Sequence, residues 1–336
     1  MALLTVLLNW RSAGMTLQAA EAALRALDGI EGALVIVDND SGDGSFEVMT
    51  AAVRERGWDT GPQAVRVIQS GRNGGFGAGN NLGIRAGLPG GGRPDFVYIL
   101  NPDAFPAPDA IRALLDHLER NPATGFAGSH IHGPDGHPHR TAFRFPSIAG
   151  EFEAQVRFGP VSRLLARSVV AAPVPDRTGR VDWLAGASLM MRMDVLDRIG
   201  LFDETFFLYF EETDLCRRAA MAGWPTDYVL ESRVTHIGSA STGMKEWTRI
   251  PEFWLDSRWH YFVKSHGRGY AALATLAHLA GGALWRARLL VQARDRGDPP
   301  GYLRDMAAHG LRKAMGQPFR GGPAPRVVEG PRRVEG

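Results

Sequence analysis

The sequence predicts an α/β protein built on a doubly wound, mostly parallel sheet, and three observations lead to this fold class. Short apolar stretches alternate with segments of helical periodicity through the first hundred residues. The apolar stretches are continuous, as parallel strands are when helices cover both faces of a sheet. Polar residues follow the stretches, at the edge where such sheets bind their ligands.

The elements of this sheet can be placed in order along the chain. Strands are expected at residues 3–8, 33–37, 65–68 and 96–100, and helices at residues 16–27, 45–54, 79–86 and 110–118. Across residues 125–178 the pattern weakens, and Gly, Pro and His interrupt it. We expect loops there, with an antiparallel hairpin that turns at Pro-Asp-Gly. The histidines of this stretch match no common metal-site spacing, so the loop interpretation is favoured.

Order returns in the second half of the chain. Residues 181–192 are expected to be regular, and a short helix over residues 194–200 ends at its glycine. Residues 247–294 are expected to be helical. Their apolar part, residues 271–285, is too short for a confident membrane span, which leaves a core helix and a membrane-surface helix as alternatives.

Composition limits the possible functions. The 336 residues carry a net charge of +2, which provides no strong field for nucleic acid. The single cysteine, Cys216, rules out an intrachain disulfide and is expected to be a small core residue. The apolar N-terminus lacks a basic segment and a cleavage site, so it predicts a buried strand and not a signal peptide.

Polar residues at the strand ends are candidates for ligand binding. The carboxylate of Asp38 could accept a hydrogen bond from an imide N–H or a ribose hydroxyl. Asn101 and Asp103, around a proline that stops the fourth strand, could hold a hard divalent cation together with phosphate oxygens. His236 could add a nitrogen ligand. An Asx–Pro turn and a structural histidine are the alternatives that the residues leave open.

The stretch 206–218 places three carboxylates directly after five bulky apolar residues. Desolvated carboxylates are costly unless they are paired or used, so this pattern indicates a general base at the rim of a pocket. The alternative is a helix whose first turn carries acids, as the helix dipole favours. Asp214 fits that alternative, because it can pair with Arg218 one helical turn later.

The glycine-rich stretch 71–81 is expected to form a flexible rim, with Asn80 and Asn81 at a helix start. Its glycines have dinucleotide-like spacing, but they follow the third strand and not the first, which makes a Rossmann dehydrogenase a weak alternative.

Taken together, these motifs resemble the inverting glycosyltransferases of family 2, in particular the rhamnosyltransferase-like branch. The resemblance spans about the first 240 residues, in the family's order. It is carried by Asn9-Trp10 and by residues 38–45, 73–84, 100–103, 182–187, 200–204, 207–218 and 236–239. Two departures stand out: the metal tripeptide is Asn-Pro-Asp and not a run of aspartates, and the base position holds Glu in place of the commoner Asp.

The resemblance implies a GT-A fold over residues 1–240, followed by a helical extension at 241–315 and a disordered tail at 316–336. It also implies the site residues. Glu212 would be the catalytic base; Asn9, Trp10, Asp38, Asn73, Asn80, Asn101 and Arg218 would bind the donor; Trp183 and Glu211 would contact the acceptor; Asp103 and His236 would hold Mg²⁺ or Mn²⁺.

The implied reaction is transfer of a sugar, with L-rhamnose from dTDP-rhamnose as the best candidate, to a saccharide or lipid-linked saccharide in bacterial surface-polysaccharide synthesis. The expected location is the cytoplasm, with peripheral contact between the C-terminal helices and the membrane, and a homodimer is possible. Two alternatives are a non-catalytic scaffold on the same fold and a nucleotidyltransferase on a related fold, and the glycine-poor loop after the first strand disfavours the second.

Overall fold

The computed structural model describes residues 1–61, 63–238, 247–292 and 298–319, and its main sheet has nine strands in this part of the chain. The strand order is β3-β2-β1-β4-β10-β6-β11-β5, with β8 on β11. The strands are β1 (Leu3–Asn9), β2 (Gly32–Asp38), β3 (Val65–Gln69), β4 (Phe96–Leu100), β5 (Ala104–Pro106), β6 (Phe126–His132), β8 (Gly179–Val181), β10 (Ser188–Arg192) and β11 (Thr226–His236).

The first four strands pair in parallel, as the sequence predicts. Strand β10 then enters antiparallel between β4 and β6, and β11 runs parallel to β6. The sheet is therefore mixed beyond β4. The observed fold confirms the predicted class, a mostly parallel sheet flanked by helices.

Helices cover both faces of the sheet, and each face has its own core. One core joins Leu3 and Leu7 to α1 (Ala13–Ala26), α2 (Ser45–Glu55) and α4 (Ala110–Arg120). The other joins Leu4 and Val6 to α3 (Phe76–Ala86), α7 (Met193–Ile199) and α8 (Glu211–Met221). Alternate residues of β1 thus point to opposite faces, and both faces are buried, which explains the continuous apolar stretch in the sequence. Cys216 lies fully buried in the second core, as predicted.

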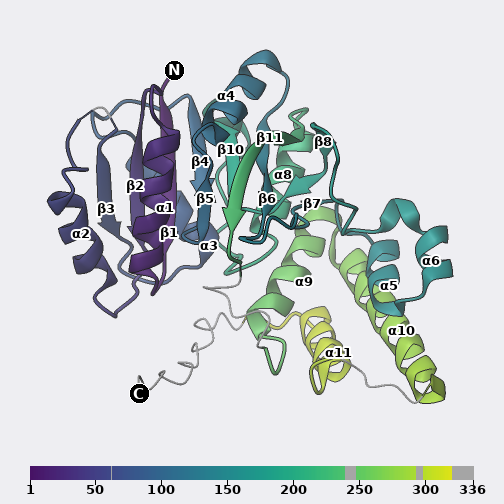
Figure 1. Ribbon diagram of the computed structural model, residues 1–336. Coiled ribbons are helices and arrows are strands. Elements are labelled where there is room, and N and C mark those ends of the chain that lie inside the picture. The colour runs from purple at the N-terminus through teal and green to yellow at the C-terminus, as the bar shows by residue number, and fades with distance from the viewer. Residues whose placement is uncertain (62, 239–246, 293–297, 320–336) are drawn as a thin grey trace, which may run out of the picture.

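A helical lobe stands beside the sheet (Figure 1). It consists of α5 (Ile148–Val156), α6 (Gly159–Leu164), α9 (Glu252–His266), α10 (Arg268–Gln292) and α11 (Tyr302–Ala314). The sequence predicted loops where α5 and α6 form, and this was wrong. The local sequence signal for α5 is limited to its N-cap, where the Ser147 hydroxyl accepts a hydrogen bond from the N–H of Gly150 at 3.1 Å. Packing against α10, far along the chain, then supports a helix too short to stand alone.

The remaining strands form a small second sheet, in which β7 (Ala142–Phe143) pairs with β9 (Trp183–Leu184). The predicted hairpin turn is present, because the N–H of Gly136 donates to the carbonyl of Gly133 at 3.0 Å and His132 bridges to Pro138. The expected tail at 316–336 lies outside the described residues from residue 320 onward.

Candidate active site

A buried polar network organises the edge where β1 and β2 end. Asn9 pairs in register with Asp38, and its side chain donates to Asp38 Oδ1 at 2.8 Å. The hydroxyl of Ser41 donates to the same oxygen at 2.6 Å, and Thr16 of α1 donates to Asn9 Oδ1 at 2.7 Å. Asn9 and Asp38 are both buried. They hold the turns that follow the two strands, while Trp10 beside them remains partly accessible.

The structure brings together the two residues that were predicted as metal ligands. Strand β11 pairs antiparallel with β5, and this register sets His236 opposite Ala104, the residue after Asp103. The N–H of Ile237 donates to the carbonyl of Asp103 at 3.1 Å. As a result, Nε2 of His236 lies 3.0 Å from Oδ1 of Asp103, whose side chain is buried.

The loop before β10 connects this edge to the carboxylates of α8. The backbone N–H of Asn101 donates to the carbonyl of Ala187 at 3.0 Å. The preceding residue, Gly186, hydrogen-bonds through its backbone to the carboxylate of Glu212. The predicted base and the end of β4 therefore flank the same short loop.

The first turn of α8 contains two carboxyl groups with raised pKa values. Burial raises the pKa of Glu212. Hydrogen bonds from the backbone amides of Glu212 and Gly186 act in the opposite direction, but the effect of burial is larger. Burial raises the pKa of Glu211 further, and the neighbouring charge of Glu212 adds to the effect. Within the described residues, one carboxyl oxygen of each side chain has no hydrogen-bond partner. Such a pair can take up a proton at a pH where ordinary glutamates stay ionised.

The loop before α8 is conformationally strained. Tyr209 and Phe210, neither of them glycine, both have φ = +71°. Residues in this region are uncommon and are concentrated at functional sites, where the surrounding structure holds them in place. Part of that support comes from the glycine-rich stretch, because the N–H of Phe76 donates to the carbonyl of Phe207 at 2.9 Å.

That contact depends on Gly75. Its φ is +89°, and a Cβ atom there would lie 1.9 Å from the carbonyl oxygen of Phe207. The glycine-rich stretch predicted as a rim therefore supports the loop that leads to Glu212. Helix α3 begins at residue 76, three residues before the expected start at residue 79.

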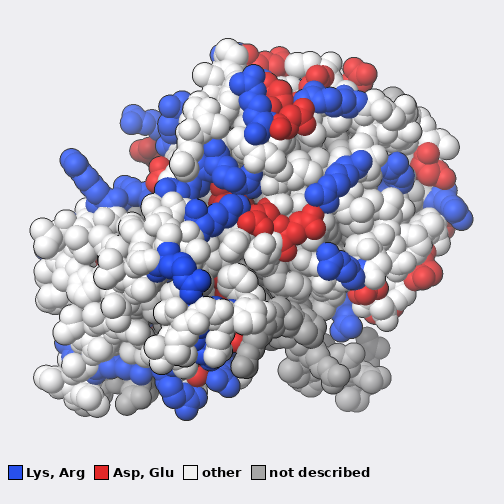
Figure 2. All heavy atoms as spheres, turned by 180° about the vertical axis from the view of Figure 1, so that it is seen from behind, with Lys and Arg blue, Asp and Glu red and all other residues white. Residues whose placement is uncertain are grey.

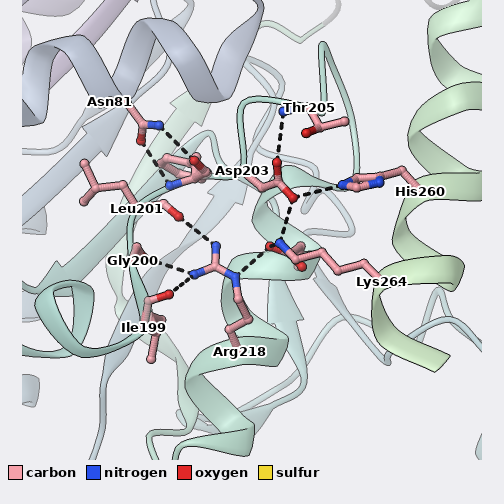
Figure 3. A network of polar contacts seen from close by, with 11 residues as sticks. Asn81, Ile199, Gly200, Leu201, Asp203, Thr205, Arg218, His260 and Lys264 are labelled. Carbon is pink, nitrogen blue, oxygen red and sulfur yellow. Dashed lines mark hydrogen bonds and ion pairs between the residues drawn. The ribbon is translucent and has the colours of Figure 1, made fainter. Parts of the chain in front are cut away.

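A polar network fixes the other side of α8 (Figure 3). Lys264 of α9 donates to Asp203 and to Asp214, both at 2.8 Å, and His260 lies 2.9 Å from Asp203. These partners, His260 foremost, hold the pKa of Asp203 well below its usual range. Asp214 also accepts from Nε of Arg218 at 2.8 Å, the predicted pair one turn apart.

Arg218, predicted as a donor-binding residue, contacts backbone carbonyls of the protein. Its remaining N–H groups donate to the carbonyls of Ile199, Gly200 and Leu201 (Figure 3). The guanidinium thus closes the end of α7 against α8. A planar group with several fixed donors is suited to this, and it leaves the side chain engaged within the protein.

Four further predicted site residues have defined positions. Asn73 accepts from the side chain of Asn39 at 3.0 Å, and the buried Asn80 donates to the carbonyl of Phe76 at 3.0 Å. Trp183 is half-buried, stacks on Phe143 with ring centroids 4.3 Å apart, and donates to a backbone carbonyl. Glu211 is only 2% exposed, so the structure does not place its carboxyl group at the surface, where an acceptor would approach.

Sequence reasoning missed Asp203, His260 and Lys264 as parts of this environment. Asp203 lay within a segment that carried the family resemblance, but no role was given to it. Lys264 had a signal of its own, because it is one of three lysines in a chain whose basic residues are otherwise arginines. Its two partners lie 50 and 61 residues away along the sequence, and no local sequence pattern predicts contacts at such separations.

The fold is that of a GT-A glycosyltransferase. Among solved structures, a mannosyltransferase from Pyrobaculum calidifontis in complex with GDP-mannose and Mn²⁺ is similar with a TM-score of 0.54 and 16% identity, over 95% of this chain and 81% of the other. GalNAc-T7 with UDP, GalNAc and Mn²⁺ has a TM-score of 0.56 and 14% identity, over 92% of this chain and 54% of the other.

The sequence places the enzyme more narrowly. Residues 21–260 match the model of "Glycosyltransferase like family 2", and the chain belongs to this family. An N-acetylglucosaminyl-diphospho-decaprenol L-rhamnosyltransferase of Mycobacterium tuberculosis is 34% identical over 220 residues, which is 62% of this chain and 68% of the relative. The rhamnosyltransferase WbbL of Escherichia coli is 26% identical over 48% of this chain and 60% of the relative. The chain is therefore a glycosyltransferase with rhamnosyltransferases among its relatives.

Proposed function

We propose that this enzyme transfers L-rhamnose from dTDP-rhamnose to a hydroxyl of a saccharide carried on a lipid diphosphate, with inversion at the anomeric carbon. The single observation that supports the chemistry most is Glu212. Its carboxyl group has a raised pKa, and one of its oxygens has no hydrogen-bond partner in the part of the chain that the structure describes. The names of the relatives support the choice of sugar and acceptor. We place the reaction in the cytoplasm, at the inner face of the membrane.

In this reaction Glu212 acts as the general base. The acceptor oxygen forms a bond to the anomeric carbon while the bond from that carbon to the departing diphosphate breaks, and the hydroxyl proton passes to the Glu212 carboxylate. A single in-line displacement of this kind inverts the centre and needs no second nucleophile. We infer that Trp10 lines the nucleotide side of the edge and that Asn101 orients the donor, while Asn9 and Asp38 fix the turns on which both depend.

A divalent cation fits the pair formed by Asp103 and His236. A carboxylate oxygen and an imidazole nitrogen 3.0 Å apart can share one ion that keeps its other positions for water and phosphate oxygens. The described residues contain no cluster of three such ligands, so the donor would have to complete the site. When bound, the cation would supply charge stabilisation to the leaving diphosphate.

The base assignment is tested by dTDP release from dTDP-rhamnose, with and without an N-acetylglucosaminyl-diphospho-lipid acceptor. Glu212→Gln should lower kcat by about 100- to 10,000-fold, whereas Glu55→Gln, an exposed acid on α2, should leave it unchanged. The base must be ionised, so the rate of the wild-type enzyme should fall with decreasing pH at a value above the ordinary range of glutamate. Full turnover by Glu212→Gln would refute the assignment.

The metal proposal has its own test. Mn²⁺ should raise the Tm of the wild-type protein and not that of Asp103→Asn, and EDTA should abolish transfer. Transfer at full rate in EDTA would remove the cation from the mechanism while leaving Glu212 in place.

A further inference from the structure

Helix α10 buries mostly small residues and exposes several large apolar ones, the opposite of what is usual for a helix that packs on a core in water. Its small residues face the protein: Ala271, Ala274, Gly281 and Gly282 are buried. A Cβ atom on Gly281 would lie 2.6 Å from the carbonyl oxygen of Phe152 in α5, so the contact there is close. Five of its large apolar residues face outward, whereas Leu289 is buried. A helix that packs on a core in water normally does the reverse.

The outward side is a continuous apolar surface, which we call the α10 face. The exposed fractions are 55% for Leu273, 60% for Leu276, 54% for Leu284, 74% for Leu290 and 88% for Val291. The exposed residues between them are alanines. The α10 face consists of Leu273, Leu276, Ala280, Ala283, Leu284, Ala287, Leu290 and Val291. These positions recur every three or four residues, so they form one stripe along most of the helix.

The charged residues of α10 itself have a single sign. Between Asp256 and Asp295 the sequence contains no acidic residue. Arg286 and Arg288 are spaced so that they border the α10 face on opposite sides. The guanidinium of Arg288 also lies 5.0 Å from the ring of Trp285 and 4.6 Å from that of Phe158. Figure 2 shows that uncharged surface predominates on the side of the helical lobe seen there, with Lys and Arg along its lower margin.

We propose that the α10 face docks on the surface of an anionic lipid bilayer, with the helix lying in the plane of the interface. Exposed leucines would enter the boundary of the acyl chains, and Arg286 beside them would meet the phosphate groups. Arg288 is engaged within the protein, because its guanidinium donates to the carbonyl of Arg157 at 2.8 Å. None of the helices in the described ranges is long and apolar enough to cross a membrane, so α10 would lie on the bilayer. This inference stands apart from the proposed reaction, because it needs neither donor nor acceptor.

Charge favours lipid over a second copy of the chain as the occupant. Two copies joined symmetrically through their α10 faces would bring the bordering arginines of both together, with no acid on the helix to pair with them. The last 17 residues of the chain, from residue 320, are a poor occupant as well. Their only large apolar residues are Val327, Val328 and Val334, against five exposed leucines and valines on the helix.

Flotation of the full-length protein with vesicles tests the docking. The wild-type chain should float with vesicles that contain phosphatidylglycerol and much less with pure phosphatidylcholine. The double variant Leu276→Glu/Leu284→Glu should lose at least about a hundredfold in partitioning, because two leucines no longer enter the interface. Val48→Glu is the matched control. It is an apolar residue on α2, 53% exposed, and this variant should float like the wild type. Figure 1 shows α2 at the end of the sheet away from α10.

A second variant isolates the charge. Arg286→Gln should weaken binding to anionic vesicles by about fivefold and leave binding to neutral vesicles unchanged. Donor hydrolysis without vesicles should be the same in all variants, which shows that they are folded and separates this test from that of Glu212. Equal flotation with both lipids, flotation of the double variant like that of the wild type, or a dimer in light scattering that the double variant abolishes would each overturn the proposal.

Discussion

The buried carboxyl group of Glu211 is costly to ionise in the folded protein, and its burial is the main cause. Its side chain is 2% exposed, one carboxyl oxygen has no partner in the described part of the chain, and burial together with the Glu212 charge raises its pKa. A carboxyl group whose pKa is higher in the folded than in the unfolded state binds its proton more tightly when folded. The free energy of unfolding therefore falls as pH rises through the interval between the two pKa values.

This sign leads to a stability prediction. Glu211→Gln should raise the free energy of unfolding by about 1–2 kcal/mol at pH 8, because it removes the cost of a buried charge. At about pH 3, below both pKa values, the carboxyl group is protonated in both states and the gain should vanish. Thermal unfolding at the two pH values measures this, with Glu55→Gln as an exposed control. An equal gain at both pH values would show that charge is not the cause.

At the scale of single residues, the sequence predicted some of the side-chain pairs that the structure contains and missed many of the backbone contacts. The resemblance brought Asp103 and His236 into one site, and helical spacing predicted the pair formed by Asp214 and Arg218, which is present at 2.8 Å. The carbonyls that occupy the rest of Arg218 were invisible to sequence reasoning. They belong to a helix end 17 to 19 residues earlier, and backbone acceptors leave no mark on the residue types.

Among the elements, the glycine-rich stretch before α3 has the sharpest consequence. Gly75→Ala introduces two separate problems, a side chain at φ = +89° and a Cβ atom 1.9 Å from the carbonyl oxygen of Phe207. Gly71→Ala introduces only the first, because φ there is +72° and nothing described lies within 4 Å of the added atom. The pair of variants therefore separates backbone strain from the contact with the strained loop.

We expect Gly71→Ala to cost about 1–2 kcal/mol of stability and to leave kcat near that of the wild type. Gly75→Ala should cost more and should also lower kcat, because the loop before Glu212 has to move. Urea unfolding and donor hydrolysis measure the two quantities. If both variants lost the same stability and kept the same kcat, the contact would have no role in positioning Glu212.

The elements themselves were predictable where their signals are local. Apart from the short β5, the strands and helices of the first 120 residues have the apolar periodicities of their type, and the structure moves their ends by only a few residues. The insertion of β10 between β4 and β6 was not predictable. Strands β4 and β10 are separated by nearly ninety residues, and alternation along the chain says nothing about which strands become neighbours.

At the scale of the whole molecule, Lys264 ties the helical lobe to the catalytic half. Its ammonium group lies between Asp203 and Asp214, 2.8 Å from each, and Asp214 is 3% exposed. Lys264→Met should lower the free energy of unfolding by about 1–3 kcal/mol, because a buried carboxylate loses one of its two cations. It should also lower kcat, since α8 carries Glu212.

The control for this prediction is Arg312→Met on α11. Arg312 pairs with Glu252 at 2.7 Å, but the two side chains are 30% and 40% exposed, so the loss should stay below about 1 kcal/mol and kcat should not change. Chemical denaturation and steady-state kinetics on both variants decide the matter. Indistinguishable results would show that the lobe and α8 are not coupled through Lys264.

The junction between α9 and α10 has a consequence for how the enzyme finds its acceptor. One residue, Gly267, separates the helix that holds Lys264 from the helix that carries the α10 face. A one-residue connection allows little relative motion of the two helices. A molecule lying on a bilayer would therefore hold its proposed catalytic base at a nearly fixed height above the lipid and in a nearly fixed orientation. Encounters with an acceptor anchored in that bilayer would become a two-dimensional search, and sugars that extend to a different height would go unrecognised. Acceptor choice would then depend partly on geometry outside the binding site.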